Sequence, residues 1–335
     1  MQRINVVTGA TGHIGVALIR ELHERGEYVR ALVRRGNSYD FLEPYIDEVA
    51  YGDVTEPESL AAAFLDADIV YHLAGIISIG KGDGANIDKV NIGGTQNVIA
   101  AAKSAGVKRL IYTSSVHALH YENADEIIRE KPYFSPEKLH DAYSVGKAVS
   151  SNLILNEVKK GELDAVILMP SGVVGPYAYR RSNIGQMIIE YVNKRLIAYI
   201  KGEYDFVDVR DVASALYAAS DTERVKSGET FLLSGNKVTV KEMLKMLERA
   251  TAVPAPRIKL PLFLAYVFVP LMERLYTLRK MKPLYTSMSI KVLNSNGNFD
   301  NTKAREILGY SPRSAEESLR EEYEFMKEEG MLSKE

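Results

Sequence analysis

The chain of 335 residues contains no cysteine, and this absence excludes disulfide bonds, thiolate catalysis and zinc–thiolate sites. No charge of one sign dominates, because 42 lysine and arginine residues face 44 aspartate and glutamate residues. No net field therefore favours nucleic acid or an anionic membrane as a partner. No apolar signal segment precedes the first predicted strand, so we expect a cytoplasmic protein. What is present, 46% hydrophobic and 26% charged residues, is typical of a soluble globular protein.

A hydrophobic run long enough to span a membrane is also lacking. The strongly apolar stretch Leu260–Met272 falls short of the roughly 20 residues that a spanning helix needs, and Pro261 and Pro270 interrupt it. We therefore expect no stable membrane insertion. We interpret the stretch as a buried helix or a lid over a pocket. The alternatives are a peripheral membrane contact, a wall for a lipophilic substrate, or the contact of a homodimer.

Short β-branched runs alternate with amphipathic stretches through the first half of the chain. This alternation is typical of repeated βαβ units and predicts an α/β fold with a Rossmann-type, doubly wound parallel sheet. We expect a nucleotide-binding domain over residues 1–170 plus about 205–235, and a smaller, discontinuous substrate lobe over about 171–204 and 236–330. The expected strands are 4–8, 28–33, 48–51, 68–72, 109–113, 164–169 and 229–233, and the expected helices are 14–25, 58–65, 87–105, 143–160, 183–193, 240–250 and a tail at 301–329 broken at 309–312.

A glycine-rich turn, Thr8–Gly15, follows the first predicted strand and opens a helix. Glycines allow a tight turn and a close approach of the backbone to phosphate, and the helix N-terminus offers its amides to a dinucleotide pyrophosphate. This context makes nucleotide binding the favoured interpretation of the turn. The predicted cofactor-binding residues here are Gly9, Thr11, Gly12, His13, Ile14 and Gly15.

The second predicted strand ends on Arg34 and Arg35, with no acid before Asp40. An acid at this place would hydrogen-bond the adenosine ribose 2′-hydroxyl, whereas an arginine accommodates a 2′-phosphate. We therefore predict that Arg34 binds the cofactor and that NADP(H) is preferred, with NAD(H) as the alternative if the arginines are solvated.

Further cofactor contacts are expected where the next strands end. Asp53 follows the third strand and can accept a hydrogen bond from the adenine amino group, or instead cap the following helix. Small residues after the fourth strand let the backbone pass close to the cofactor. The residues predicted on these grounds are Asp53, Val54, Leu73, Ala74, Gly75, Asn91 and Thr113.

Tyr143 and Lys147 stand four residues apart on a predicted helix, so their side chains share one face. A tyrosine ordinarily titrates near pH 10, and a neighbouring ammonium favours its phenolate. Ser115 closes the fifth predicted strand, where a hydroxyl can hold a substrate carbonyl oxygen while a phenol delivers the proton. We predict Ser115, Tyr143 and Lys147 as catalytic residues, with Tyr143 and Lys147 also beside the cofactor and with no metal required.

In this order, the glycine turn, the strand-end serine and the YxxxK motif resemble the extended branch of the short-chain dehydrogenase/reductase superfamily, which is NAD-dependent epimerase/dehydratase-like. The resemblance implies an NAD(P)-dependent oxidoreductase with Ser115 preferred over Ser114, and it adds Pro170 and Val173 to the expected cofactor contacts. The matching runs are Thr8–Gly15, Asn91–Thr95, Pro170–Pro176, Phe206–Ala213 and the tail from Phe299 to Pro312.

Within this branch, the resemblance is nearest to dihydroflavonol reductase-like and 3β-hydroxysteroid dehydrogenase-like members. Val116 and His117 stand where sugar-nucleotide dehydratases carry Asp-Glu, so dehydration is not expected. The leading hypothesis is an NADP(H)-dependent oxidoreductase that acts on a hydrophobic, ring-containing alcohol or ketone of steroid or flavonoid type. His117, Tyr177 and Tyr179 are predicted to bind this small-molecule substrate.

Two alternatives stay open. A sugar-nucleotide epimerase with tightly bound NAD fits the branch, and the pair Arg180-Arg181 could clamp a phosphate. A non-catalytic nucleotide-binding scaffold is less favoured, because such a protein usually loses part of the Ser-Tyr-Lys trio and this chain retains all of it.

Overall fold

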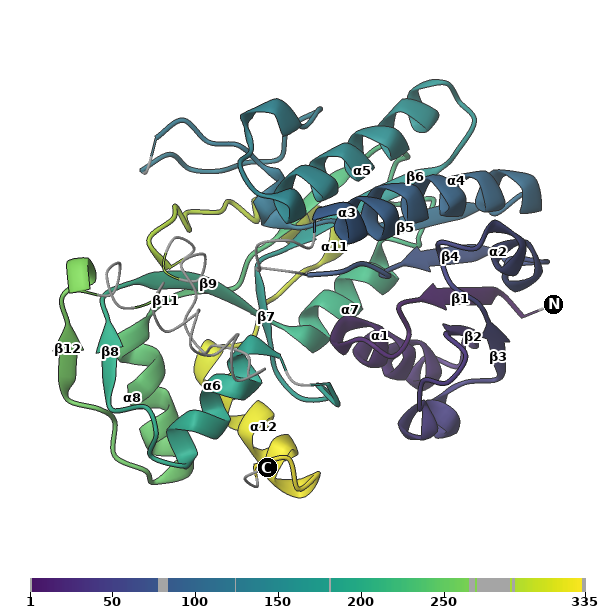
Figure 1. The fold of residues 1–335 in the computed structure, drawn as a ribbon. Helices are drawn as coiled ribbons and strands as arrows, with labels where there is room; N and C mark the ends of the chain where they lie inside the picture. Colours follow the sequence, from purple (N-terminus) through teal and green to yellow (C-terminus); the bar gives the residue numbers. More distant parts are fainter. Residues whose placement is uncertain are drawn as a thin grey trace.

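The computed structural model describes residues 2–77, 84–123, 125–180, 182–264, 269, 290 and 293–332. Seven strands form one sheet, and every neighbouring pair in it is parallel (Figure 1). The predicted Rossmann-type parallel sheet is confirmed. In spatial order the strands are β10 (Thr230–Leu233), β6 (Ala165–Pro170), β5 (Arg109–Thr113), β4 (Ile69–His72), β1 (Ile4–Thr8), β2 (Tyr28–Val33) and β3 (Glu48–Tyr51).

Helices cover both faces of the sheet (Figure 1). Successive residues of β1 point to opposite faces, so Val6 and Val7 enter two different hydrophobic cores. Burial on both sides is why the strands read as nearly continuous apolar runs. On one face α1 (His13–Glu24) packs with α7 (Val209–Ala218), and on the other lie α2 (Pro57–Ala63), α4 (Gly94–Ala105) and α5 (Ala142–Lys159).

The helix predicted over 87–105 is wrong in detail, because it is three segments. They are α3 (Gly84–Ile87), a π-helical stretch η2 (Asp88–Gly93) and α4. In the widened turn the Asn91 carbonyl accepts hydrogen bonds from the hydroxyls of Thr95 (2.6 Å) and Ser150 (2.9 Å). A π-turn of this kind has no periodicity that a sequence pattern would reveal, and such turns occur often at functional sites.

Within the described residues five strands lie outside the main sheet, and the sequence predicted none of them. Four of the five have only three or four residues, which is too short for an alternating pattern to be recognised. The five strands form a three-stranded sheet and a separate pair. Three helices, all close to prediction, pack with the three-stranded sheet: α6 (Asn183–Val192), α8 (Val240–Thr251) and α12 (Ala315–Glu328). We call this sheet and its helices the smaller core. Its sheet contains β11 (Asn236–Thr239), β9 (Glu203–Asp208) and β7 (Gly172–Val174), and a separate pair contains β8 (Ala198–Ile200) and β12 (Ile258–Leu260).

Other expectations have mixed outcomes. The strand predicted at 229–233 does join the main sheet as β10, and the tail does break between α11 (Thr302–Leu308) and α12. The division into a nucleotide-binding domain and a substrate lobe stays a prediction. Most of the apolar stretch Leu260–Met272 lies outside the described residues. Within the part of the chain that the structure describes, no helix is long and apolar enough to cross a membrane.

The turn after β7 joins the main sheet to the smaller core. The Nε2 atom of His13, at the start of α1, lies 3.1 Å from the Gly175 carbonyl and 2.8 Å from the Pro176 carbonyl. From the other side, the Glu322 carboxyl on α12 accepts the Gly175 N–H at 3.1 Å. Gly175 has φ of +119°, a conformation that side-chain-bearing residues rarely adopt.

This joint predicts a pH-dependent stability. Burial raises the pKa of Glu322 from 4.5 to about 7, against the hydrogen bonds from Gly175 and Ser182. The folded protein therefore holds this proton more tightly than the unfolded chain, and the stability that it contributes falls as pH rises from 4.5 to about 7. Glu322→Gln keeps an acceptor oxygen without a charge, so we expect it to raise the free energy of unfolding at about pH 8 by at most ~3 kcal/mol.

Urea unfolding measures this effect. At about pH 3 the variant and the wild type should unfold alike, because Glu322 of the wild type is then protonated in the folded protein and almost fully protonated in the unfolded chain. Glu328→Gln, an exposed substitution on the same helix, is the control for a general charge effect. A Glu322→Gln variant that is less stable than the wild type at both pH values would contradict the prediction.

Candidate active site

The glycine turn between β1 and α1 lies against the end of β4. A Cβ atom on Gly9 would lie 2.7 Å from the Ala74 backbone nitrogen, and one on Gly15 would lie 2.3 Å from the Gly9 carbonyl oxygen. Both positions therefore require glycine. Gly12 caps α1 without a side-chain hydrogen bond, and the first turn of the helix carries no acid. The backbone N–H groups at such a helix start can bind an anion by donating hydrogen bonds to it.

A chain of buried hydrogen bonds connects this turn to η2. The Ala74 N–H donates to the Thr8 hydroxyl (3.2 Å), which lies 3.0 Å from His72 Nδ1, and His72 Nε2 lies 3.0 Å from the Thr95 hydroxyl. Thr95 donates onward to the Asn91 carbonyl. One neutral tautomer of His72, with the proton on Nε2, satisfies every member. Burial, assisted by the charge of Lys147, lowers the pKa of His72 to about 3, which agrees with a neutral ring.

Three residues predicted to bind the cofactor meet beside η2. The Asn91 amide holds the Ile76 backbone, accepting from its N–H at 2.8 Å and donating to its carbonyl at 3.1 Å. A Cβ atom on Gly75 would lie 3.3 Å from Asn91 Oδ1 and 3.6 Å from Lys147 Nζ. Gly75 thus leaves room for Asn91 and Lys147 at one place on the carboxyl edge of the sheet.

Tyr143 and Lys147 stand near the start of α5, where the Asp141 carboxylate caps the helix by accepting the Ser144 N–H at 2.9 Å. Lys147 Nζ donates to the Thr113 carbonyl at 2.7 Å and lies 4.8 Å from the centre of the Tyr112 ring. Burial lowers the pKa of Lys147 to about 7. Burial also raises the pKa of Tyr143.

The two serines after β5 have different partners. Ser114 shares a 2.8 Å hydrogen bond with Ser151, whose hydroxyl is also 2.8 Å from the Lys147 carbonyl, so Ser114 is part of the α5 packing. The Ser115 side chain meets Tyr143, and this contact works against the rise in the tyrosine pKa. The Ser115 oxygen also accepts the His117 N–H at 3.2 Å. Ser115, Tyr143 and Lys147 therefore gather at one site, although their catalytic roles stay predictions.

The sequence reasoning missed Tyr204. The His117 ring lies between Tyr143, whose ring is edge-on at 6.3 Å, and Tyr204, whose ring is nearly parallel at 6.0 Å. Tyr204 belongs to the unpredicted strand β9 and lies 87 positions from His117 in the chain. No local pattern could have signalled this contact.

Tyr177 and Tyr179 are largely occupied by packing. Both rings lie edge-on to Phe325 of α12, at 5.9 and 5.1 Å, and Tyr179 also stacks on Phe41 at 4.2 Å. Within the described chain, no ring contact or hydrogen bond connects either tyrosine to Ser115, Tyr143 or Lys147. Their role in substrate binding stays a prediction, and Arg181 lies outside the described residues.

The predicted adenosine-side residues have separate environments. Arg34 is exposed at the end of β2, and Arg35 lies 5.2 Å from the centre of the Tyr51 ring. One oxygen of Asp53 accepts both the N–H and the hydroxyl of Thr55, at 2.9 and 2.8 Å, in the loop before α2. The N-cap of α2 is Glu56 and has no side-chain hydrogen bond, so Asp53 does not cap that helix. Val54 packs against Gly94, Pro170 ends β6 and Val173 lies in β7. The cofactor contacts of these residues stay predictions.

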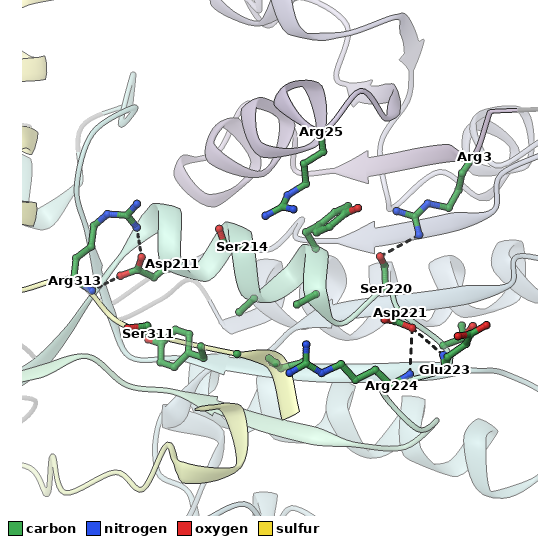
Figure 2. A pocket seen from close by; sticks show the side chains of 17 residues that line it. Arg3, Arg25, Asp211, Ser214, Ser220, Asp221, Glu223, Arg224, Ser311 and Arg313 are labelled. Atoms are coloured by element: carbon green, nitrogen blue, oxygen red, sulfur yellow. Dashed lines mark hydrogen bonds and ion pairs between the residues drawn. The ribbon is translucent and has the colours of Figure 1, made fainter. Parts of the chain in front are cut away.

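A cleft of about 960 Å³ lies elsewhere, between α7, the end of α1 and residues 308–313 (Figure 2). Two of its arginines already have partners: Arg313 pairs with Asp211, and the Arg25 guanidinium lies 4.2 Å from the Tyr217 ring centre. It contains none of the predicted site residues, so we do not assign the chemistry to it.

A nicotinamide dinucleotide fits the carboxyl edge of the sheet. The start of α1 carries no acid, and the Thr113 hydroxyl is buried there without a hydrogen-bond partner among the described residues. The glycine turn, the residues after β4 and the start of α5 would surround the group. Ligands of open parallel sheets bind at such a switch point, where β4 and β2 lie on opposite sides of β1.

Comparisons with known proteins agree. The model of the NAD-dependent epimerase/dehydratase family matches residues 5–234. The chain is 34% identical over 331 residues to the sterol demethylase protein B of Methylococcus capsulatus, covering 98% of this chain and 99% of that protein. It is 29% identical to a Synechocystis protein provisionally named a dihydroflavonol 4-reductase, covering 97% and 95%. The crystal structure of gox2253 matches with a TM-score of 0.85 at 30% identity, covering 99% of this chain and 100% of that one.

These matches fit the class that the fold and the site define, enzymes that bind a nicotinamide dinucleotide at the edge of a parallel sheet. The chain belongs to the NAD-dependent epimerase/dehydratase family, in the extended branch of the short-chain dehydrogenase/reductase superfamily. It is an NAD(P)-dependent oxidoreductase of that type, and the resemblance found in the sequence is confirmed.

Gly15→Ala tests the glycine turn. The added methyl group would overlap the Gly9 and Ala10 carbonyl oxygens, at 2.3 and 2.8 Å, so the turn must shift. We expect the dissociation constant for NADPH or NADH, measured by nucleotide fluorescence, to rise roughly tenfold or more. Gly84→Ala is the matched control, because no atom lies within 4 Å of its added methyl group. Equal cofactor affinity in both variants would contradict the assignment.

Proposed function

We propose that the chain is an NADP(H)-dependent oxidoreductase that interconverts a hydrophobic, ring-containing alcohol and its ketone. The observation that carries the proposal is that Ser115, which meets Tyr143, and Lys147, which binds the Thr113 carbonyl, lie together at the end of β5 and the start of α5. A phenol, a hydroxyl and a buried ammonium at this place can hold and protonate a carbonyl oxygen.

A nicotinamide dinucleotide bound at the carboxyl edge of the sheet would supply the hydride for reduction or accept it in oxidation. In the direction of reduction, the buried Tyr143 phenol donates its proton to the substrate oxygen, while the Ser115 hydroxyl holds that oxygen by a hydrogen bond. The Lys147 ammonium then stabilises the phenolate that remains, because an opposite charge nearby favours the charged form of an acid. In the direction of oxidation the same groups act in reverse, and the Tyr143 phenolate accepts the proton from the alcohol.

The substrate class is supported by the name of one relative and by the character of the site. The sterol demethylase protein B of Methylococcus capsulatus is named for a sterol, a large apolar ring system. His117 and Tyr204 bring aromatic rings beside Tyr143. Burial of apolar surface contributes roughly 25 cal/mol for each Å², so a ring substrate should bind far better than a short-chain ketone.

A substrate screen tests the function. Steroid, flavonoid, short aldehyde and nucleotide-sugar compounds are followed through the absorbance of the reduced nicotinamide, with both cofactors and both reaction directions. We expect ring-containing ketones or alcohols to have the highest kcat/KM. Tyr143→Phe should lower turnover by about 10² or more, because a positioned acid contributes that much, while its cofactor dissociation constant stays near wild type.

The screen can fail in distinguishable ways. Undiminished turnover in Tyr143→Phe contradicts the mechanism. Short aldehydes that react as efficiently as any ring compound contradict the substrate class alone. A nucleotide sugar that is converted without net change in nicotinamide absorbance would favour the epimerase alternative.

The preference for NADP(H) is supported by Arg34, which is exposed at the end of β2. A charge-assisted contact with a 2′-phosphate is worth roughly 1.5–3 kcal/mol, which corresponds to about a tenfold or larger preference. Arg34→Asp should therefore reverse the preference in fluorescence titrations with NADPH and NADH. Arg35→Asp makes the same charge change one position away and is the control. Equal affinities of the wild type for the two cofactors would contradict the assignment.

A further inference from the structure

The mechanism above leaves the hydrogen bond between His117 and Tyr204 without a role. His117 lies in the short 3₁₀ turn η3 (Val116–Ala118), which follows strand β5 of the main sheet. Tyr204 belongs to β9 of the smaller core. The Tyr204 hydroxyl lies 2.8 Å from His117 Nε2. A side-chain bond thus joins the two parts of the molecule directly beside Tyr143.

The Tyr204 ring is held firmly in this place. A Cβ atom on Gly172 of β7 would lie 2.7 Å from Tyr204 Cε1, so the ring uses space that only glycine leaves open. Phe206 lies edge-on to it at 5.6 Å, and the backbone of Tyr204 pairs with Val238 of β11. Burial strongly raises the pKa of Tyr204, so this residue stays a phenol and has a proton to donate.

The His117 ring is neutral, so its Nε2 atom can accept the hydrogen bond from Tyr204. Burial lowers the pKa of His117, and only the charge of Asp141 works in the other direction. A neutral imidazole that accepts at Nε2 carries its own proton on Nδ1. With Tyr204 as the donor, His117 is the tautomer protonated at Nδ1, and this is the assignment that the NMR experiment below tests.

The effect of the bond reaches Ser115 through the backbone. The His117 N–H donates to the Ser115 oxygen at 3.2 Å. This bond uses one acceptor site of the Ser115 hydroxyl. The hydroxyl hydrogen stays available for a hydrogen bond to the substrate oxygen, which in the proposed mechanism faces Tyr143. Fixing the His117 ring therefore fixes the turn that aims the Ser115 hydroxyl.

We propose that Tyr204 and His117 are positioning residues, and that their hydrogen bond lets the smaller core set the orientation of the Ser115 hydroxyl against Tyr143. The inference rests on the proposed oxidoreductase function. Neither residue exchanges a proton with the substrate. The pair acts on the rate of the chemical step and leaves the cofactor site unchanged.

Tyr204→Phe removes only the hydroxyl and keeps the ring that fills the space beside Gly172. With the best carbonyl substrate from the screen, we expect kcat to fall roughly five- to tenfold, the equivalent of one net hydrogen bond, while the cofactor dissociation constant is unchanged. Tyr191→Phe is the matched control, because it removes another phenol hydroxyl of the smaller core, one that donates to the Val253 carbonyl. A fall in kcat that Tyr191→Phe reproduces would overturn the proposal.

Variants at His117 give an independent test. His117→Ala should lower kcat as Tyr204→Phe does, and the double variant should be no slower than either single one. His117→Gln, whose amide can meet the Tyr204 hydroxyl, should restore most of the rate. Additive losses in the double variant would overturn the proposal. Loss in His117→Ala without rescue in His117→Gln would overturn it even if Tyr204→Phe failed to fold.

A readout that needs no turnover separates this inference from the proposed function. In protein labelled with ¹⁵N-histidine, NMR should find His117 protonated at Nδ1, and Tyr204→Phe should shift its Nε2 signal while the signals of His13 and His72 stay in place. An unshifted His117 signal overturns the pair, whatever the activity. Undiminished turnover in Tyr143→Phe together with a shifted His117 signal would instead sink the proposed mechanism and leave the hydrogen bond standing.

Discussion

The close backbone approach between the β1–α1 turn and the segment after β4 is the constraint on which the rest of the site depends. The space between Gly9 and Ala74, and between Gly15 and Gly9, is too small for any Cβ atom. This contact brings the start of α1 and the end of β4 to one edge of the sheet. Lys147, Asn91 and the proposed dinucleotide site can share that edge only because the two backbones meet there.

A polar chain inside an apolar core maintains this contact. Thr8, His72 and Thr95 are fully or nearly fully buried, and an unpaired polar group at such depth would be strongly destabilising. One tautomer of His72 satisfies the whole chain, so the network fixes a single arrangement. Its last member, the Asn91 carbonyl, also accepts from Ser150 of α5. The helix that carries Tyr143 and Lys147 is thereby tied to the glycine turn.

The sequence predicted what is local and missed what is not. Four of the six strands expected in the first half of the chain have the predicted bounds, because three of them are buried on both faces and Gly26 and Gly106 end the helices between them. Tyr143 and Lys147 could be paired because four-residue spacing on a helix is a local property. The π-helical stretch at Asn91 and the contact between His117 and Tyr204 have no local signature. They arise from packing between elements that are distant in the chain.

Among the contacts that hold the smaller core against the main sheet, two lie at the two ends of the site. One is the turn at Gly175, gripped by His13 at the start of α1 and by Glu322 on α12. The other is the bond between Tyr204 and His117 beside Tyr143. Because the first contacts the helix of the glycine turn and the second the turn after β5, the smaller core is fixed relative to both. The relation between the glycine turn and Tyr143 therefore depends on the smaller core as well as on the main sheet.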